Sequence, residues 1–143
     1  MTEYLTHDVI LDLSEESPED LTLNMLRFAN RGTTLVMARS PVAHDKTLDE
    51  AIDDQLNMLR KKSKAMTITP TQAVYLGRSE PPVEAREMAI QFMVGNKPNF
   101  QLQAACLIPG QQRMLVLNYS KHGPLDDEDI RHWRAIKHKL RFT

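Results

Sequence analysis

The sequence predicts an α+β domain with a curved antiparallel sheet and two main helices. Apolar residues alternate with polar ones along most of the chain, with the period of two that strands show. Two segments follow a helical period instead, and turn residues separate the alternating segments. The order of strands, helix, strands and helix is typical of the α+β class. The 143 residues fit a single domain, 1–143, that can bury a substantial core.

The first third of the chain is predicted to form strands. Residues 4–11 alternate weakly and indicate a first strand, which ends at the polar break 14–20. Two further strands are expected at 21–29 and 33–39. The sequence Asn30-Arg31-Gly32 between them favours a hairpin turn.

The first helix is expected over residues 47–63. Thr47 and Glu50 match a capping box, in which the side chain of each residue accepts a hydrogen bond from the backbone N–H of the other. The helix ends in the basic run 60–64, which suits the negative end of the helix dipole.

Gln55 interrupts the apolar stripe of this helix. A step of about 100° per residue places it on the face that should be buried, among Leu48, Ala51, Ile52 and Leu59. A buried amide without partners costs roughly 1–3 kcal/mol. Gln55 is therefore either bonded within the core of this protein or held for something that docks.

The second half of the chain predicts a meander of antiparallel strands. We expect strands at 66–76, 83–94, 98–108 and 113–120, separated by breaks at Gly77–Pro82, Gly95–Pro98 and Pro109–Gln112. The last helix begins after Asp126, which can cap it, while Leu125 and Ile130 can form a hydrophobic staple. Its core face is made by Trp133, Ile136 and Leu140.

One side of the predicted sheet carries uncharged amides and soft apolar side chains where a solvated sheet would carry Lys, Glu and Thr. Transmembrane helices contact one another through similar surfaces, with small residues at the contact and polar groups as hydrogen-bonding partners. Such a face could shelter apolar helices; alternatively, a helix or a second subunit of the same chain covers it. The candidate residues are Leu23, Met25, Leu35, Met37, Gln55, Gln91, Gln101 and Gln103, although the sequence does not decide which sheet face each one occupies.

Other functional classes are disfavoured by composition. The formal charge of -1 argues against a nucleic-acid binder. The five histidines follow no metal-ligand spacing and are expected at the surface, and no nucleophile elbow or phosphate-binding glycine loop occurs. We therefore expect no enzyme activity, no metal and no cofactor. Cys106 lies in an apolar run and is expected to be buried.

The N-terminal residues lack the charged and apolar regions of a signal peptide, and no stretch approaches the roughly 18 apolar residues of a transmembrane helix. We expect a cytoplasmic protein without stable membrane insertion.

Three segments carry a resemblance to a known family: Leu23–Phe28, Leu48–Leu56 and the closing helix with Trp133. They resemble the DcrB-related family, in particular the Eag chaperones encoded beside type VI secretion effectors. The resemblance implies a Mog1/PsbP-like fold, usually a homodimer. It also implies a cytoplasmic chaperone that binds the N-terminal transmembrane helices of an effector, commonly of the PAAR or Rhs type, and helps to load it onto the secretion spike.

The same resemblance implies roles for individual residues. Met25 matches an apolar position that faces the client, and Gln55 matches a helix glutamine that bonds to it. Gln103 matches a strand glutamine of that surface, although Gln101 could be the residue instead. The alternative hypothesis is a non-enzymatic Mog1-like interaction module that binds a folded partner.

Overall fold

The computed structural model describes residues 2–62, 66–78 and 80–143, and it confirms the α+β class. A seven-stranded sheet has the order β3-β4-β9-β8-β7-β5, and β6 also pairs with β7. All of its strand pairs are antiparallel. The strands are β3 (Leu23–Phe28), β4 (Thr33–Pro41), β5 (Thr67–Ile68), β6 (Gln72–Leu76), β7 (Val83–Val94), β8 (Lys97–Leu107) and β9 (Arg113–His122).

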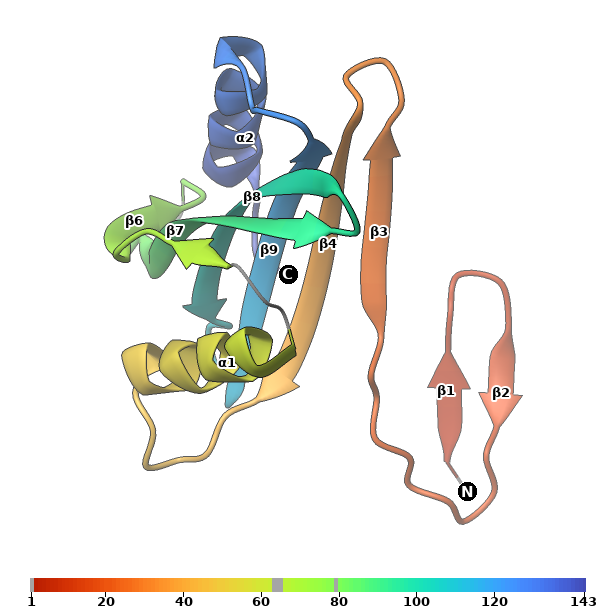
Figure 1. The fold of residues 1–143 in the computed structure, drawn as a ribbon. Coiled ribbons are helices and arrows are strands. Elements are labelled where there is room, and N and C mark those ends of the chain that lie inside the picture. The colour runs from red at the N-terminus through yellow and green to blue at the C-terminus, as the bar shows by residue number, and fades with distance from the viewer. Residues whose placement is uncertain (1, 63–65, 79) are drawn as a thin grey trace.

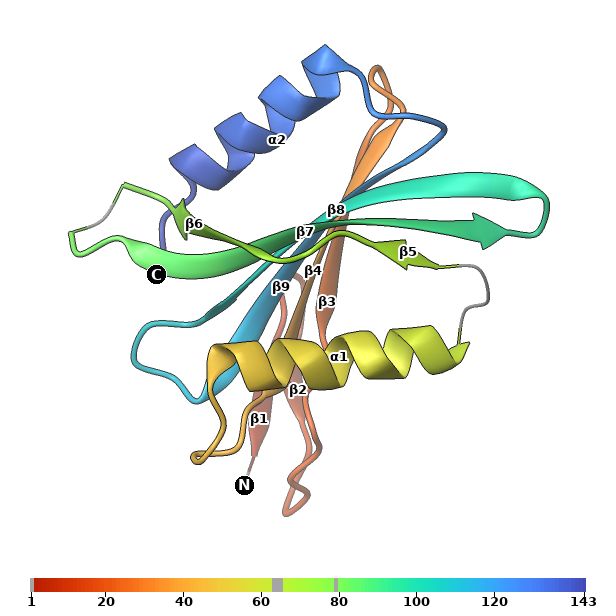
Figure 2. The same cartoon turned by 60° about the vertical axis from the view of Figure 1, so that its left-hand side comes forward.

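The two helices pack on opposite faces of this sheet (Figures 1 and 2). Helix α1 (Leu48–Lys62) shares a core cluster with Ala105 of β8, and α2 (Asp127–Lys139) shares another with the neighbouring Ala104. Successive strand residues point to opposite sides, so the sheet has an α1 face and an α2 face. Trp133 of α2 is 2% exposed and fills the core on the second face, as expected.

The N-terminal segment differs from the prediction of one strand over 4–11. It forms a separate two-stranded sheet of β1 (Glu3–Leu5) and β2 (Ile10–Asp12). The hydroxyl of Thr6 accepts hydrogen bonds from the backbone N–H groups of Asp8 and Val9, and these bonds close the turn between β1 and β2. The sequence pattern did not indicate this turn, because threonine is common in strands as well as in turns.

The strand predicted at 66–76 is divided in the structure. β5 and β6 pair with different parts of β7, and residues 69–71 between them include Pro70. Proline has no N–H to donate to a ladder and commonly interrupts a strand. The first helix begins after its predicted cap; its predicted last residue, Ser63, lies outside the described residues, as does Lys64 of the basic run.

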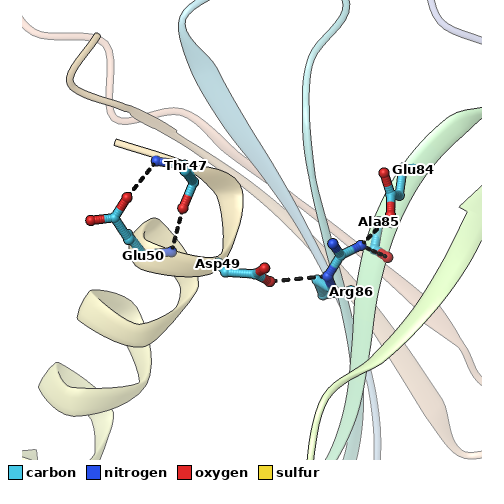
Figure 3. Close-up of polar contacts among 6 residues, drawn as sticks. All are labelled: Thr47, Asp49, Glu50, Glu84, Ala85 and Arg86. Atoms are coloured by element: carbon cyan, nitrogen blue, oxygen red, sulfur yellow. Dashed lines mark hydrogen bonds and ion pairs between the residues drawn. The ribbon is translucent and has the colours of Figure 1, made fainter. Parts of the chain in front are cut away.

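The predicted caps are confirmed. Thr47 and Glu50 bond reciprocally at the start of α1 (Figure 3). Asp126 caps α2 and forms a capping box with Asp129. Leu125, Ile136 and Leu140 pack against the core on the α2 face.

Candidate functional site

Helix α1 is fixed to the sheet at its N-terminal end. Asp49 in its first turn lies 3.0 Å from the Nε of Arg86 on β7, and Arg86 also pairs with Glu84 at 2.9 Å (Figure 3). Apolar residues further along α1, namely Ala51, Ile52 and Leu56, are buried against the α1 face. This anchoring sets the position of the side chains in the middle of the helix.

The structure brings Gln55 and Gln103 together. Gln103 lies on β8 and is 1% exposed, whereas Gln55 on α1 is half-buried. The Nε2 of Gln103 donates a hydrogen bond of 2.9 Å to the Oε1 of Gln55 and also lies 3.9 Å from the sulfur of Met88. The amide of Gln55 is therefore bonded within the protein, which was one of the two alternatives that the sequence left open.

Buried acceptors without a partner remain on the same face; one, the Oδ1 of Asn99, lies four residues before Gln103 on β8, and two lie on neighbouring strands. The Oε1 of Gln103 and the Oδ1 of Asn118 accept no hydrogen bond from any described residue. The two residues lie opposite each other in the ladder between β8 and β9, so both belong to the α1 face. Leaving a buried acceptor unpaired costs about 1–3 kcal/mol. Together with Gln55, these oxygens make this part of the α1 face polar within an otherwise apolar surface.

Exposed apolar residues lie at the edge of the same face. Leu23 and Met25 on β3 are 55% and 65% exposed. They pair with Ala38 and Val36 of β4, which in turn pair with Val116 and Asn118 of β9. The register therefore continues the α1 face from the buried amides to the free edge of the sheet.

A groove of about 440 Å³ between α1 and β4 completes this region. Gln55 lies on its helix side, and Ala38 and Met114 lie on its sheet side. We call the region the open strip and define it by seven residues: Leu23, Met25, Val36, Ala38, Gln55, Gln103 and Asn118.

Three residues of the predicted surface lie on the other side of the sheet. Leu35 is 4% exposed and packs in the core beneath α2, with Met37 against the same core. Gln91 pairs with Phe100, which precedes Gln101 on β8 and therefore points to the opposite face of the sheet. The prediction that Leu35 and Met37 extend the face of Met25 is therefore wrong, because the hairpin register pairs Met25 with Val36.

The remaining candidates share the α1 face. Gln101 pairs with Ile90 and Ser120, is half-buried, and lies two residues from Gln103 on β8. Gln103 is the strand glutamine that contacts Gln55. Asn118 was missed, although it is the polar residue that interrupts the apolar run from Met114 to Tyr119.

Two titratable groups lie away from the open strip. Cys106 is buried as expected, and burial raises the pKa of its thiol to about 11. His132 was expected at the surface but is half-buried: its Nδ1 lies 2.7 Å from the hydroxyl of Tyr119, and Phe28 packs edge-on against its ring. Burial, together with the charge of Arg31, lowers the pKa of His132. Among the described residues, no three His, Cys, Asp or Glu side chains are placed to hold a metal ion.

The chain matches the DcrB family over residues 11–139. It belongs to that family. A crystal structure of PA94, a protein of unknown function from Pseudomonas aeruginosa, has the same fold as this DcrB-family chain, with a TM-score of 0.69 and 14% identity. The similarity covers 99% of this chain and 98% of PA94. A comparison with curated proteins finds no match. In the described part of the chain, neither helix is long and apolar enough to cross a membrane.

Proposed function

We propose that this DcrB-family protein is a non-enzymatic cytoplasmic chaperone for the N-terminal transmembrane helices of a type VI secretion effector. It would shield these helices and help to load the effector, of the PAAR or Rhs type, onto the secretion spike. The observation that carries the proposal is the exposed apolar pair Leu23 and Met25 on the same sheet face as the groove lined by Gln55. The Mog1/PsbP-like assignment of the fold remains part of this proposal.

The length of the strand beneath the open strip supports an apolar helix as the ligand. β4, which contributes Val36 and Ala38 to the strip, contains nine residues, and at about 3.3 Å per residue it spans roughly 30 Å. A helix of about 20 residues is equally long and matches the apolar thickness of a bilayer. One transmembrane helix laid along β4 would therefore match the strand in length and cross the strip at Val36 and Ala38.

The chemistry of the strip suits such a helix. Burial of apolar surface on Leu23, Met25 and Val36 contributes about 25 cal/mol per Å². Nearly all backbone N–H groups of a helix are already bonded within it, so hydrogen bonds to the half-buried amide of Gln55 must come from client side chains. We expect client helices with Ser or Thr among small residues at the contact, because their hydroxyls donate and their size permits close approach.

Co-expression with the N-terminal apolar region of a neighbouring effector tests this proposal. Size-exclusion chromatography with light scattering should show a soluble complex of defined stoichiometry. Met25→Glu should abolish it, because a charge would then lie in the apolar contact at a side chain that is 65% exposed and contributes little to folding.

Met93→Glu is the matched control. Met93 is also exposed, at 43%, but it lies on β7 away from the open strip. Retention of the complex by Met93→Glu and its loss in Met25→Glu would support the proposed surface. An equal effect of the two variants would contradict it. Failure of the unchanged protein to solubilise the effector region would favour a Mog1-like module that binds a folded partner.

A further inference from the structure

A surface pocket of about 720 Å³ lies beside the end of α2, away from the open strip. It is lined by the loop between β6 and β7, by Pro109 in the turn between β8 and β9, and by the segment that follows α2. Leu140 and Phe142 of that last segment also pack against the core beneath α2, so the pocket belongs to the α2 side of the sheet. The open strip lies on the α1 face, and the two surfaces can therefore be occupied at the same time.

The walls of this pocket are held in place by the backbone. The N–H of Gly77 donates a hydrogen bond of 2.8 Å to the carbonyl oxygen of Lys137 in the last turn of α2. This bond fixes the loop between β6 and β7 against the helix end. Three of the eight prolines of the chain line the pocket: Pro81, Pro82 and Pro109. Because the ring of proline fixes φ, these walls lose little conformational freedom when a ligand binds.

The pocket carries an excess of positive charge. Three charged side chains line it: Arg78, Glu80 and Arg141. Both arginines are exposed, and neither forms an ion pair within the described part of the chain. The helix dipole accounts for basic residues in the last turn of α2, such as Lys139. It does not account for Arg78 and Arg141, which lie outside the helix, so their charges are available to an anionic ligand.

The positive charge continues along α2. Its acidic residues are confined to the first turn, Asp127 to Asp129. The later turns carry exposed Arg134 and Lys139, and neither of these forms an ion pair within the part of the chain that the structure describes. Charges of one sign attract and orient a partner of the opposite sign. The pocket and the end of α2 together are therefore complementary to an acidic partner.

The shape of the pocket favours a segment of a protein as the ligand. Sites for free small molecules bury about 70–90% of the ligand surface. Arg78, Pro82 and Arg141 are exposed, so a ligand in this pocket is covered on one side only. A protein segment can place one side chain in the pocket and continue along the basic end of α2. A flat membrane surface, by contrast, does not reach into a concave pocket.

We propose that this pocket binds an acidic segment of a partner protein, with one large apolar side chain of that segment as the anchor. The anchor packs against Pro109 and Phe142, while Asp or Glu residues on either side of it pair with Arg78 and Arg141. Hydrogen bonds between carboxylate and guanidinium groups are charge-assisted and are often bidentate. Glu80 repels a carboxylate inside the pocket, so the anchor itself is uncharged. This inference does not depend on client binding.

Fluorescence polarisation with model peptides tests both parts of the proposed ligand. The probe is a short fluorescein-labelled peptide in which one Phe is flanked on both sides by Asp and Glu. It should bind the unchanged protein. Replacing its Phe by Ser, or its acidic residues by Asn and Gln, should weaken binding by at least about tenfold in each case. Failure of the first peptide to bind, or equal binding of all three, would overturn the proposal.

Charge reversal in the protein tests the role of the two arginines. Arg78→Glu with Arg141→Glu should bind the probe at least about tenfold more weakly, because each attraction becomes a repulsion. Both side chains are exposed, so the unfolding temperature should stay close to that of the unchanged protein. Arg27→Glu with Lys97→Glu is the matched control, since it makes the same change in net charge at exposed residues outside the pocket. An equal loss of binding in the two double variants would contradict the proposal.

Photo-cross-linking locates the bound peptide. A benzophenone side chain in place of the Phe of the probe should attach to residues 80–83, 109 and 140–142, identified by mass spectrometry. Attachment to the open strip instead would overturn the proposed site. Vesicles of phosphatidylglycerol provide a comparison with a membrane surface. Vesicle binding that is lost in the variant with Arg78→Glu and Arg141→Glu, without binding of the peptide, would show that anionic lipid is the ligand and would also overturn the proposal.

Discussion

Replacing Gln103 by leucine should stabilise the protein while weakening client binding. The substitution removes the unpaired Oε1, whose burial costs about 1–3 kcal/mol, and loses the bond to Gln55, which contributes about 0.5–1.5 kcal/mol. Gln55 is half-buried and can bond to water instead. Because leucine has a similar volume, we expect a net gain of about 1 kcal/mol and a rise in Tm of about 4 °C.

Urea denaturation of Gln103→Leu and Gln55→Leu separates a binding role from a structural one. Gln55→Leu leaves both the donor and the acceptor of Gln103 without an amide partner, so it should destabilise the fold by about 1–3 kcal/mol. The double variant should recover most of that loss. Destabilisation by Gln103→Leu, or unchanged client binding by the stabilised variant, would refute the view that this amide is retained for a partner.

Three further predictions concern the fold and its titratable groups. Gly77 has a φ of +76°, and a Cβ added there would lie 2.8 Å from the backbone oxygen of Leu140; Gly110 has a similar φ of +75° but open space around it. Gly77→Ala should therefore lower the free energy of unfolding more than Gly110→Ala. Equal losses of about 1–2 kcal/mol would show that only the backbone conformation matters. Burial lowers the pKa of His132, so the folded state binds its proton less readily than the unfolded chain. Stability should therefore fall as pH drops below the ordinary pKa of about 6.5 and level off below the folded pKa; denaturation curves of His132→Asn should lack this component. The thiol of Cys106, with a pKa of about 11, should react with a disulfide reagent only after unfolding, and rapid labelling of the native protein would contradict its burial.

Sequence patterns were sufficient where the signal is local. The caps at Thr47 and Asp126 could be identified because each depends on residues three positions apart. The contact between Gln55 and Gln103 could not be derived from periodicity, because it joins residues 48 positions apart and depends on where α1 crosses the sheet.

The faces of the first hairpin show a second limit of sequence reasoning. Alternation correctly separates Met25 from its neighbours, but it does not decide whether Met25 shares a face with Leu35 or with Val36. That choice depends on the pairing register across the turn, and a shift of one residue moves a whole strand to the opposite face. Leu35 and Met37, which the sequence grouped with Met25 as candidates, consequently lie on the opposite face, whereas Gln101 and Gln103 share one face as alternation predicts.

The dimensions of the open strip also limit what one protomer can shelter. A helix is about 10 Å across with its side chains, and a sheet beneath it contacts only one side. The rest of its apolar surface would stay in water unless a second client helix or a second protomer covers it. Two client helices packed against each other, each bound to the strip of one protomer, would cover one another's remaining apolar surface. We therefore expect two protomers for each client region with a pair of transmembrane helices, measurable as the mass of the purified complex by light scattering. A stable complex of one protomer with such a region would show that the strip covers more of a helix than its four strands suggest.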